Sequence, residues 1–455
     1  METPNTKTQI KNSEQNSVVE YDLNASEFSW EIAPGKTIKA WGFNNQVPGP
    51  FIKAKVGDTL VVRVKNDLEE STVIHWHGLR IPSSMDGTGV VQKPIAPGET
   101  FEYRFVLPDA GTFWYHSHAN ETEQVERGMY GALIVEDDTD PKTDGEQIFM
   151  FDDMKLDAKN NFTKPAWFVP RIMERHDGRQ GDTLLINGKE KPVITIHAGQ
   201  SERWRFINSS SARYVYLSLG GKAFQVIATD GGLLEQPMTK TKVLLTPGER
   251  VDIIAGPYSE GESFSIESLP YNRMTFLKAK REVFATVKVE ESRPSVAFIP
   301  GMLRKIEPLA PQTAVVNKKI KFSVGPSLKN GMNFLINNKI HVDDAPVKVG
   351  ELQIWEVFNA SLMDHPFHLH GDFFQVIEEN GKAPEYRAWK DTYNLTPRTK
   401  IKIAWMPDNR KGMWMYHCHI LEHHEAGMMA NFEIVSENRA LAENEPQKLS
   451  HQHHH

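Results

Sequence analysis

VGDTLVVRVKN, residues 56–66, opens on a turn glycine, continues as a run rich in apolar residues and closes on a turn asparagine. The same frame recurs in AGQSERWRFIN (198–208) and VGELQIWEVFN (349–359), with the glycine and the asparagine nine residues apart each time. Such a run between two turns is typical of a half-buried β-strand. Because the three asparagines lie 142 and 151 positions apart, the repeat has the size of a domain, not of a solenoid unit.

The composition agrees with a chain of many short strands. Among 455 residues there are 31 glycines and 27 prolines, which favours frequent turns over long helices. The formal net charge is −7 and no basic stretch is present, so binding to nucleic acid or to anionic membranes is not expected. No apolar run approaches the roughly 18 residues that a membrane helix needs. The single cysteine, Cys418, excludes an intrachain disulfide and cysteine-rich metal clusters.

We therefore predict an all-β protein of three consecutive Greek-key β-sandwich domains. The expected segments are a first domain at 1–137, a second at 138–289, a proline-rich linker at 290–312, a third domain at 313–436 and a polar tail at 437–455. The tail ends in a short histidine tract, which reads as a tag or a native extension and is left out of the site.

Histidine pairs occupy matching places in the first and third copies. Each pair has the pattern His-x-His, which aims both imidazoles to one side of a strand; the pairs are His75/His77, His116/His118, His368/His370 and His417/His419. The middle copy has Leu217 and Leu219 at the position of the first pair, so we expect these two leucines to face apolar packing. Eight imidazoles around one cavity suit two or three metal ions such as copper, zinc, iron or nickel.

Cys418 lies between His417 and His419, so its side chain points to the opposite face of that strand. There it can meet a second set of side chains: His365, His423 and Met428. One thiolate, two imidazoles and a distant thioether form the ligand set of a blue-copper electron-transfer site. The sequence thus predicts two metal centres that are joined through adjacent residues.

An ordinary structural role is the usual explanation for a single His-x-His pair or a lone buried cysteine. The joint pattern of four pairs, one cysteine, two further histidines and a methionine favours metal binding. Structural or tail roles are expected for the other eight histidines, at positions 176, 197, 341, 424, 451, 453, 454 and 455.

From about residue 18 to 436 the chain resembles the three-domain multicopper oxidases, the laccase family. Four motifs carry the resemblance, in the family's order: HWHG at 75–78, HSH at 116–118, HPFHLHG at 365–371, and HCHILEH at 417–423 followed by Met428. The resemblance implies three cupredoxin-like domains and four coppers per chain, one type 1, one type 2 and two type 3.

Ligand assignments follow from the family pattern. They imply His75 and His368 on the type 2 copper; His77, His116 and His419 on one type 3 copper; His118, His370 and His417 on the other; and His365, Cys418, His423 and Met428 on the type 1 copper. Electrons are expected to enter through a solvent-facing edge of His423 or His365, and then to pass through Cys418 to His417 and His419. Met428 follows the bacterial style and predicts a modest potential.

Acidic residues near the cluster are candidate proton donors. Asp86, eleven residues after His75, matches an acid that the family places near the cluster, although Asp86-Gly87 is also a common turn pair. Bacterial relatives usually have glutamate directly after the equivalent of His423. Here that position is His424, with Glu425 next, so both are candidates for the second relay.

The resemblance implies a laccase-type oxidase that takes single electrons from phenols or aromatic amines and reduces dioxygen to water. Its partners would be a small reducing substrate and dioxygen, with no nucleic acid or membrane, and the chain would be a monomer in the periplasm or secreted. One alternative is an oxidase of Cu(I) in copper tolerance, which Met363 favours but the missing methionine-rich insertion does not. Another alternative is a metal-free scaffold.

Overall fold

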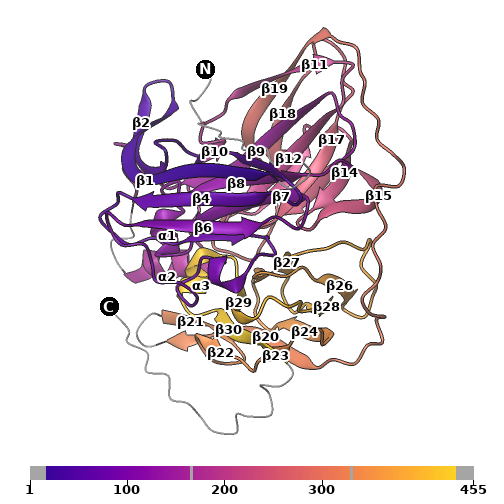
Figure 1. The fold of residues 1–455 in the computed structure, drawn as a ribbon. Helices are drawn as coiled ribbons and strands as arrows, with labels where there is room; N and C mark the ends of the chain where they lie inside the picture. The colour runs from indigo at the N-terminus through magenta and orange to yellow at the C-terminus, as the bar shows by residue number, and fades with distance from the viewer. Residues whose placement is uncertain (1–16, 164–167, 328–330, 437–455) are drawn as a thin grey trace.

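The computed structural model describes residues 17–163, 168–327 and 331–436. Its strands form six sheets, two for each of three β-sandwiches that follow one another along the chain, so the predicted all-β class is confirmed. The three sandwiches appear in Figure 1 as the indigo, magenta and orange-to-yellow parts of the ribbon.

The first sandwich spans Val18 to Glu136. One sheet has the order β2 (Lys36–Phe43), β1 (Val18–Ala33), β4 (Thr59–Asn66) and β6 (Thr100–Val106). The other has the order β3 (Ile52–Lys55), β8 (Tyr130–Glu136), β7 (Gly111–Ser117) and β5 (Ile74–His77).

The middle sandwich spans Gly145 to Ser292. Its six-stranded sheet has the order β10 (Thr183–Ile186), β9 (Gly145–Met154), β12 (Glu202–Asn208), β17 (Arg250–Ala255), β14 (Phe224–Thr229) and β15 (Gly232–Lys240). Its five-stranded sheet has the order β11 (Val193–Ala198), β19 (Glu282–Ser292), β18 (Ser263–Ser268), β13 (Val215–Leu219) and β16 (Lys242–Leu245).

The third sandwich spans Lys318 to Val435. One sheet has the order β21 (Gly331–Ile336), β20 (Lys318–Ser327), β24 (Gln353–Asn359), β28 (Lys400–Trp405) and β26 (Gln375–Glu379). The other has the order β22 (Val342–Asp343), β30 (Met429–Val435), β29 (Gly412–Cys418), β25 (His365–Leu369) and β27 (Thr392–Leu395), with β23 (Val347–Lys348) also paired to β30.

The asparagines that close the three repeated runs have the same structural role. Each one ends a strand, and its side-chain amide donates to a backbone carbonyl a few residues on and to another further along the chain: Asn66 to Glu70 and Ile95, Asn208 to Arg213 and Leu245, and Asn359 to Met363 and Leu395. Each side-chain oxygen also accepts from the backbone amide two residues later. These buried bonds fix the loop that leads into the next strand, which is β5, β13 or β25.

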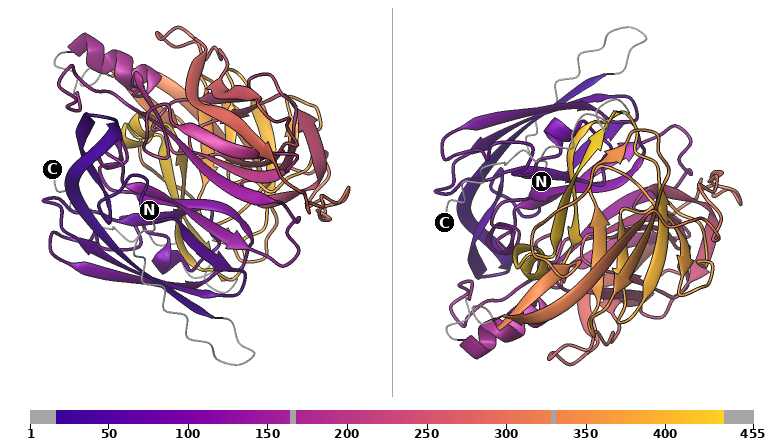
Figure 2. Two further views of the ribbon diagram at one scale, coloured as in Figure 1. Left: turned by 90° about the horizontal axis from the view of Figure 1, so that it is seen from above. Right: turned by 90° about the horizontal axis from the view of Figure 1, so that it is seen from below.

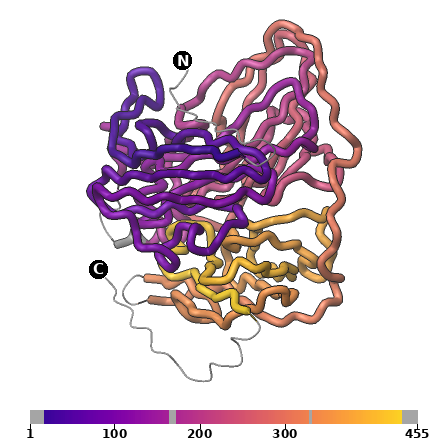
Figure 3. The backbone as a smooth tube through the Cα atoms, in the orientation of Figure 1, coloured from indigo at the N-terminus to yellow at the C-terminus, as the bar shows by residue number. Residues whose placement is uncertain are grey.

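Each sandwich buries a core of its own, and short helices lie where the sandwiches meet. They are η1 (Ser83–Met85), α1 (Glu121–Gln124), α2 (Phe168–Asp177) and α3 (Leu421–Glu425). The segment between β19 and β20 runs along one edge of the molecule (Figure 3), and the views from above and below place the third sandwich against the other two (Figure 2). Within the described parts of the chain, the helices are too short or too polar to span a bilayer.

We propose the domain division predicted from the sequence. The first boundary, after residue 137, falls just beyond β8, and the linker at 290–312 is free of strands apart from the last residues of β19.

Candidate metal centre

Strand pairing brings the four His-x-His motifs together. In the first sandwich β5 pairs with β7 so that His75 lies opposite His116, and in the third β25 pairs with β29 so that His368 lies opposite His417. The two sandwiches then place their histidines against each other: His75 stacks on His370 with ring centroids 3.9 Å apart, and His77 stacks on His368 at the same distance. The predicted meeting of the four pairs in one place is therefore present.

Most of these imidazoles turn one nitrogen away from the cluster and onto a protein oxygen. The contacts are His75 Nδ1 to the Asp86 carbonyl at 2.8 Å, His77 Nε2 to Asp391 Oδ1 at 3.2 Å, His116 Nδ1 to the Ser117 carbonyl at 2.8 Å, His118 Nδ1 to Glu121 Oε1 at 2.8 Å, His368 Nδ1 to the Asp391 carbonyl at 2.9 Å, His370 Nδ1 to Asp86 Oδ2 at 2.9 Å and His417 Nδ1 to the Cys418 carbonyl at 2.8 Å. Because a carbonyl or carboxylate oxygen only accepts, the outer nitrogen donates in each case.

The inner nitrogens are therefore left with lone pairs and without protein donors. No hydrogen-bond partner is found for the inner nitrogens of His75, His77, His116, His118 and His368, nor for either nitrogen of His419, among the described residues. The two inner nitrogens of His370 and His417 face each other at 2.9 Å. Buried lone pairs that point at one another are costly unless a cation lies between them. This arrangement fits a group of closely spaced metal ions.

Burial keeps most of these imidazoles neutral. It lowers the pKa of His75, His77, His370, His417 and His419 well below the usual value, with a further contribution from neighbouring imidazoles, and the pKa of His116 falls to about 3. His118 is the exception, because the Glu121 carboxylate outweighs burial and raises its pKa. Neutral imidazole is the form that binds a metal ion.

The second predicted centre lies on the other face of β29. Cys418 Sγ is 3.5 Å from His365 Nδ1 and 3.6 Å from His423 Nδ1, and these two nitrogens are 3.2 Å apart. Met428 is buried in the same core, and its backbone carbonyl accepts from the Cys418 amide at 3.1 Å. Burial raises the pKa of the Cys418 thiol, so the thiolate that a soft metal requires depends on the metal itself.

The expectation of a solvent-facing histidine edge at this centre is wrong. His365 and His423 are both fully buried. His365 Nε2 lies 3.0 Å from the Ser361 hydroxyl, and His423 Nε2 donates to the backbone carbonyl of His176 at 3.0 Å. His176 belongs to α2 of the middle domain, a helix that covers the site and that the sequence patterns did not place there.

Asp86 lies directly beside the cluster. Besides its bond to His370, its Oδ1 is 3.5 Å from His75 Nδ1 and has no hydrogen-bond partner. Burial raises the pKa of this carboxyl to about 7, against smaller opposite contributions from His118 and Arg410. A carboxyl with a pKa near neutrality is suited to hold and release a proton.

His424 lies next to the cluster, a position that its expected structural role did not anticipate. Its ring stacks on His417 at 4.2 Å, and its Nδ1 is 3.0 Å from Glu121 Oε2. His118, His417 and His424 bring one ligand atom each within 4.8 Å of the others. Glu425 instead accepts from the backbone amide and hydroxyl of Thr122, at 2.9 and 2.8 Å. The carboxylate beside this part of the cluster is thus Glu121, from α1 of the first domain.

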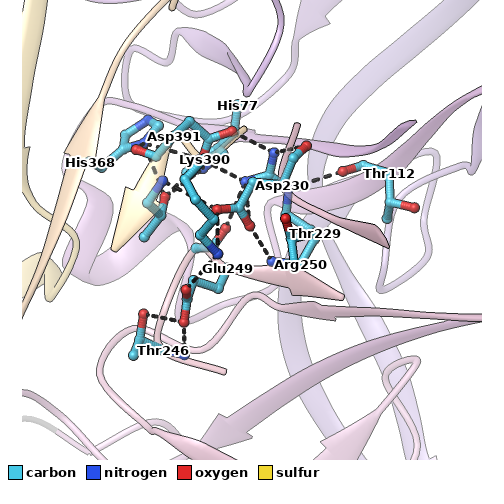
Figure 4. A network of polar contacts seen from close by, with 12 residues as sticks. His77, Thr112, Thr229, Asp230, Thr246, Glu249, Arg250, His368, Lys390 and Asp391 are labelled. Atoms are coloured by element: carbon cyan, nitrogen blue, oxygen red, sulfur yellow. Dashed lines mark hydrogen bonds and ion pairs between the residues drawn. The ribbon is translucent and has the colours of Figure 1, made fainter. Parts of the chain in front are cut away.

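Asp391 and Arg250 are further residues at the cluster that the sequence analysis did not find. Asp391 contacts His77 and His368, and Arg250 pairs with Asp391 at 2.6 Å (Figure 4). Burial alone would raise the pKa of Asp391, but the Arg250 guanidinium outweighs it and holds this pKa well below its usual range. A charged residue beside an apolar strand, as in RVDII at 250–254, is the only sequence signal that marks Arg250.

Together the two centres define a class of protein: a blue-copper type of site that is joined, through the neighbours of one cysteine, to a multinuclear histidine cluster. Three family models described as multicopper oxidase match residues 24–140, 158–269 and 310–438. The chain is 32% identical over 443 residues to the multicopper oxidase mco of Staphylococcus aureus, covering 93% of this chain and 90% of that protein.

Solved structures agree. A multicopper oxidase from Campylobacter jejuni, described as a metallo-oxidase, matches with a TM-score of 0.82 and 31% identity over 95% of this chain and 94% of the other. A laccase from Pediococcus acidilactici matches with a TM-score of 0.81 and 28% identity over 96% and 94% of the two chains. The chain belongs to the multicopper oxidase family, so it is an oxidoreductase with type 1, type 2 and type 3 copper, and its domains are cupredoxin-like.

Proposed function

We propose that this multicopper oxidase is of the laccase type, oxidising phenolic or related aromatic donors one electron at a time and reducing dioxygen to water. The observation that carries the proposal is a cavity of about 440 Å³ whose lining includes Asp177, the residue next to the His176 carbonyl that accepts from His423 Nε2. Aromatic and aliphatic side chains of the middle domain contribute to its lining, among them Tyr214, Tyr271, Leu269 and Leu277.

The copper ligands are proposed as the family pattern assigns them. His365, Cys418, His423 and Met428 would hold type 1 copper; His75 and His368 type 2; and His77, His116 and His419, with His118, His370 and His417, the type 3 pair. The unpartnered inner nitrogens support these sets. Bound copper would supply the one-electron and dioxygen chemistry. The chain contributes the covalent connection from Cys418 to His417 and His419, a buried pocket and, at Asp86, a carboxyl that holds a proton.

The cavity is connected to the type 1 centre by a short route. Asp177 and Gly178 line the cavity, and the carbonyl that accepts from His423 Nε2 belongs to His176, the residue directly before Asp177. Tyr214, another lining residue, packs in the same apolar core as Cys418. A donor in this cavity would therefore be separated from a type 1 ligand by one peptide group and one hydrogen bond.

Charge in the cavity favours an organic donor over a metal ion. Four acids line it, Glu174, Asp177, Asp182 and Glu282, against five bases, Lys155, Arg213, Arg273, Lys278 and Lys280. Glu174, Asp182 and Glu282 pair with lining bases, and Asp177 accepts from the backbone amides of Phe276 and Leu277. Met173 is the one methionine among the lining residues. A cuprous ion would prefer several thioethers.

Oxidation of Cu(I) is the second candidate, and the likeness to the Campylobacter metallo-oxidase favours it. Met363, which the sequence singled out for this role, is buried in the core around the type 1 site. Its thioether is therefore not at the surface where a metal ion would first bind.

Comparing the turnover of a phenol with the turnover of Cu(I) tests the proposal. Ala279→Trp introduces an indole into the cavity lining, and we expect it to raise the KM for a phenol such as 2,6-dimethoxyphenol about tenfold or more while the blue colour stays unchanged. Val193→Trp, at an exposed position of β11 outside the cavity, is the matched control. Cu(I) turnover that exceeds phenol turnover in the parent protein, with a KM for phenol that Ala279→Trp leaves unchanged, would contradict the laccase assignment.

We further propose that the chain acts as a monomer outside the cytoplasm, in the periplasm or after secretion. The reason for the location is that reduced thiols, which bind copper in the cytoplasm, are scarce in these compartments. Subcellular fractionation and the mass of the copper-loaded protein in solution test these two statements.

A further inference from the structure

The middle domain contains no copper ligand in the proposed assignment, yet one of its turns reaches the cluster. The turn at 246–250 leads into β17, and its shape is fixed by Glu249, whose Oε2 accepts from the backbone amide and hydroxyl of Thr246 at 2.9 and 3.0 Å. Gly248 at its centre has φ +87°, and a Cβ there would lie 2.8 Å from Cδ2 of His419. Only glycine lets the ring of His419 approach this backbone so closely.

Arg250 ends the turn and is bonded on all sides. Its Nε donates to the Thr112 carbonyl at 3.0 Å, Nη1 to the Gly248 carbonyl at 3.1 Å and Nη2 to the Asp230 carbonyl at 3.1 Å. The remaining two N–H groups form a fork on Asp391, with Nη1–Oδ1 at 2.7 Å and Nη2–Oδ2 at 2.6 Å. All five donors of the guanidinium are used, and the acceptors come from the first, the middle and the third domain.

Asp391, which Arg250 holds in place, contacts two cluster histidines in turn (Figure 4). Its Oδ1 accepts from His77 Nε2 at 3.2 Å, and its backbone carbonyl accepts from His368 Nδ1 at 2.9 Å. The Thr392 hydroxyl also lies 3.1 Å from His368 Nδ1 and donates to Asp391 Oδ1 at 2.9 Å. With the outer nitrogens held in this way, His77 can present only Nδ1 and His368 only Nε2 to a metal ion.

A purely stabilising role does not account for this arrangement. A second ion-pair group, Lys390 with Asp230 at 2.9 Å and with Glu249 at 2.8 Å, lies beside the first. Buried ion pairs are weak contributors to stability, because desolvation offsets most of the attraction, and apolar side chains often serve as well. A planar fork whose partner orients two imidazoles has a use that an apolar replacement lacks.

We propose that the turn at 246–250 is a positioning element of the copper cluster, in which Arg250 acts through Asp391 to fix the ring orientations of His77 and His368. The inference rests on the copper assignment proposed above. It gives the middle domain a part in copper binding without a ligand of its own.

Arg250→Lys and Arg250→Met test the proposal in copper-loaded full-length protein. Lysine keeps the charge but cannot form the fork, and methionine removes both. For both variants we expect a changed type 2 copper EPR hyperfine splitting and a 10–100-fold faster extraction of cluster copper by a chelator, the usual cost of losing an outer-shell partner. The blue type 1 absorption per folded molecule should stay as in the parent, because Cys418 and its partners are not in contact with Arg250.

Arg203→Met is the matched control. Arg203 is an equally buried arginine of the middle domain that pairs with Asp252 at 2.7 Å and Asp140 at 2.9 Å, with no cluster histidine among its partners. We expect it to lower Tm while the type 2 signal and the extraction rate stay as in the parent.

The outcomes separate the inference from the copper assignment. An Arg250→Lys protein with the parental EPR signal and extraction rate overturns the positioning role, also if Arg250→Met does not fold. A change of equal size in Arg203→Met overturns it too, because the effect would then follow any loss of a buried charge. A parent protein without type 2 copper would overturn the ligand assignment first.

Discussion

Strands β25 and β13 occupy the same place in the third and the middle sandwich, yet one carries proposed copper ligands and the other does not. Each follows a strand that ends in an asparagine, Asn359 or Asn208, whose side-chain amide donates to backbone carbonyls. Where β25 has His368, β13 has Leu217, and Leu217 and Leu219 are fully buried in the apolar core of the middle domain, as the sequence predicted. The same backbone thus accepts imidazoles or leucines at these positions. Copper chemistry in this molecule is a property of a few side chains, not of the fold.

The largest effect is expected from the single thiol that the middle copy lacks. Cys418→Ser should abolish the blue absorption and nearly all oxidase activity, because serine cannot supply the soft ligand that gives the colour and connects the two centres. The fold should persist, since a near-isostere replaces one buried residue. Absorbance near 600 nm and oxygen consumption measure the two losses, with circular dichroism as the control. A Cys418→Ser protein that is still blue would contradict the type 1 assignment.

The second largest effect is expected from the proton supply to the histidine cluster of the first and third domains. Asp86→Asn keeps the shape and the bond to His370 but cannot release a proton, so dioxygen turnover should fall by about 10²–10⁴-fold. Copper content, colour and reduction of the type 1 site by substrate should be retained. His424→Ala, beside the same cluster, should have a clearly smaller effect on steady-state oxygen consumption. If His424→Ala were the slower enzyme at equal copper content, the route through Glu121 and His424 would be the main one.

Matched truncations of the two strands should have opposite consequences. Leu217→Ala in the middle copy should lower the free energy of unfolding by about 2–5 kcal/mol through the cavity it leaves, with copper content unchanged. His368→Ala in the third copy should lose type 2 copper. Denaturant unfolding and metal analysis check both. A Leu217→Ala protein that is fully folded but has lost copper would contradict the purely structural role of this strand.

Acid should weaken the copper-free protein through the buried cluster histidines of the first and third domains. Several cluster imidazoles have pKa values held well below the ordinary value near 6.5, so the unfolded chain binds more protons than the folded one as the pH falls. Their stabilising contribution is complete above about pH 6.5 and decreases below it, by about 1.4 kcal/mol per pH unit for each imidazole that stays neutral. Buried carboxyls such as Asp86, whose pKa burial raises to about 7, titrate in the opposite sense, so the test is a difference between two proteins. The Tm of copper-free His417→Leu minus that of the copper-free parent should grow between pH 6.5 and pH 5, and a difference that shrinks toward pH 5 would contradict a neutral, buried His417.

Much of the site could be predicted from the sequence because most of the proposed ligands lie on strands or directly after their last residue. The two-residue period fixes which side chains share a face, so His75 with His77, and Cys418 opposite its two neighbours, follow from spacing alone. The threefold recurrence of the glycine–asparagine frame fixed the order of the three sandwiches in the same way.

What the sequence could not predict are contacts between loops of different domains. Arg250 meets Asp391 across 141 residues, and His424 meets Glu121 across 303. The backbone of α2 covers His423 from another domain. No periodicity relates such positions, because they depend on how three finished sandwiches pack against each other.

The most direct test of the account is the position of each copper atom in a crystal of the loaded protein, from anomalous scattering at the copper edge. We predict four peaks: one beside Cys418, His365 and His423, and three among the eight histidines of the first and third copies. A peak bound by side chains of the middle domain, or a type 1 position without Cys418, would contradict it.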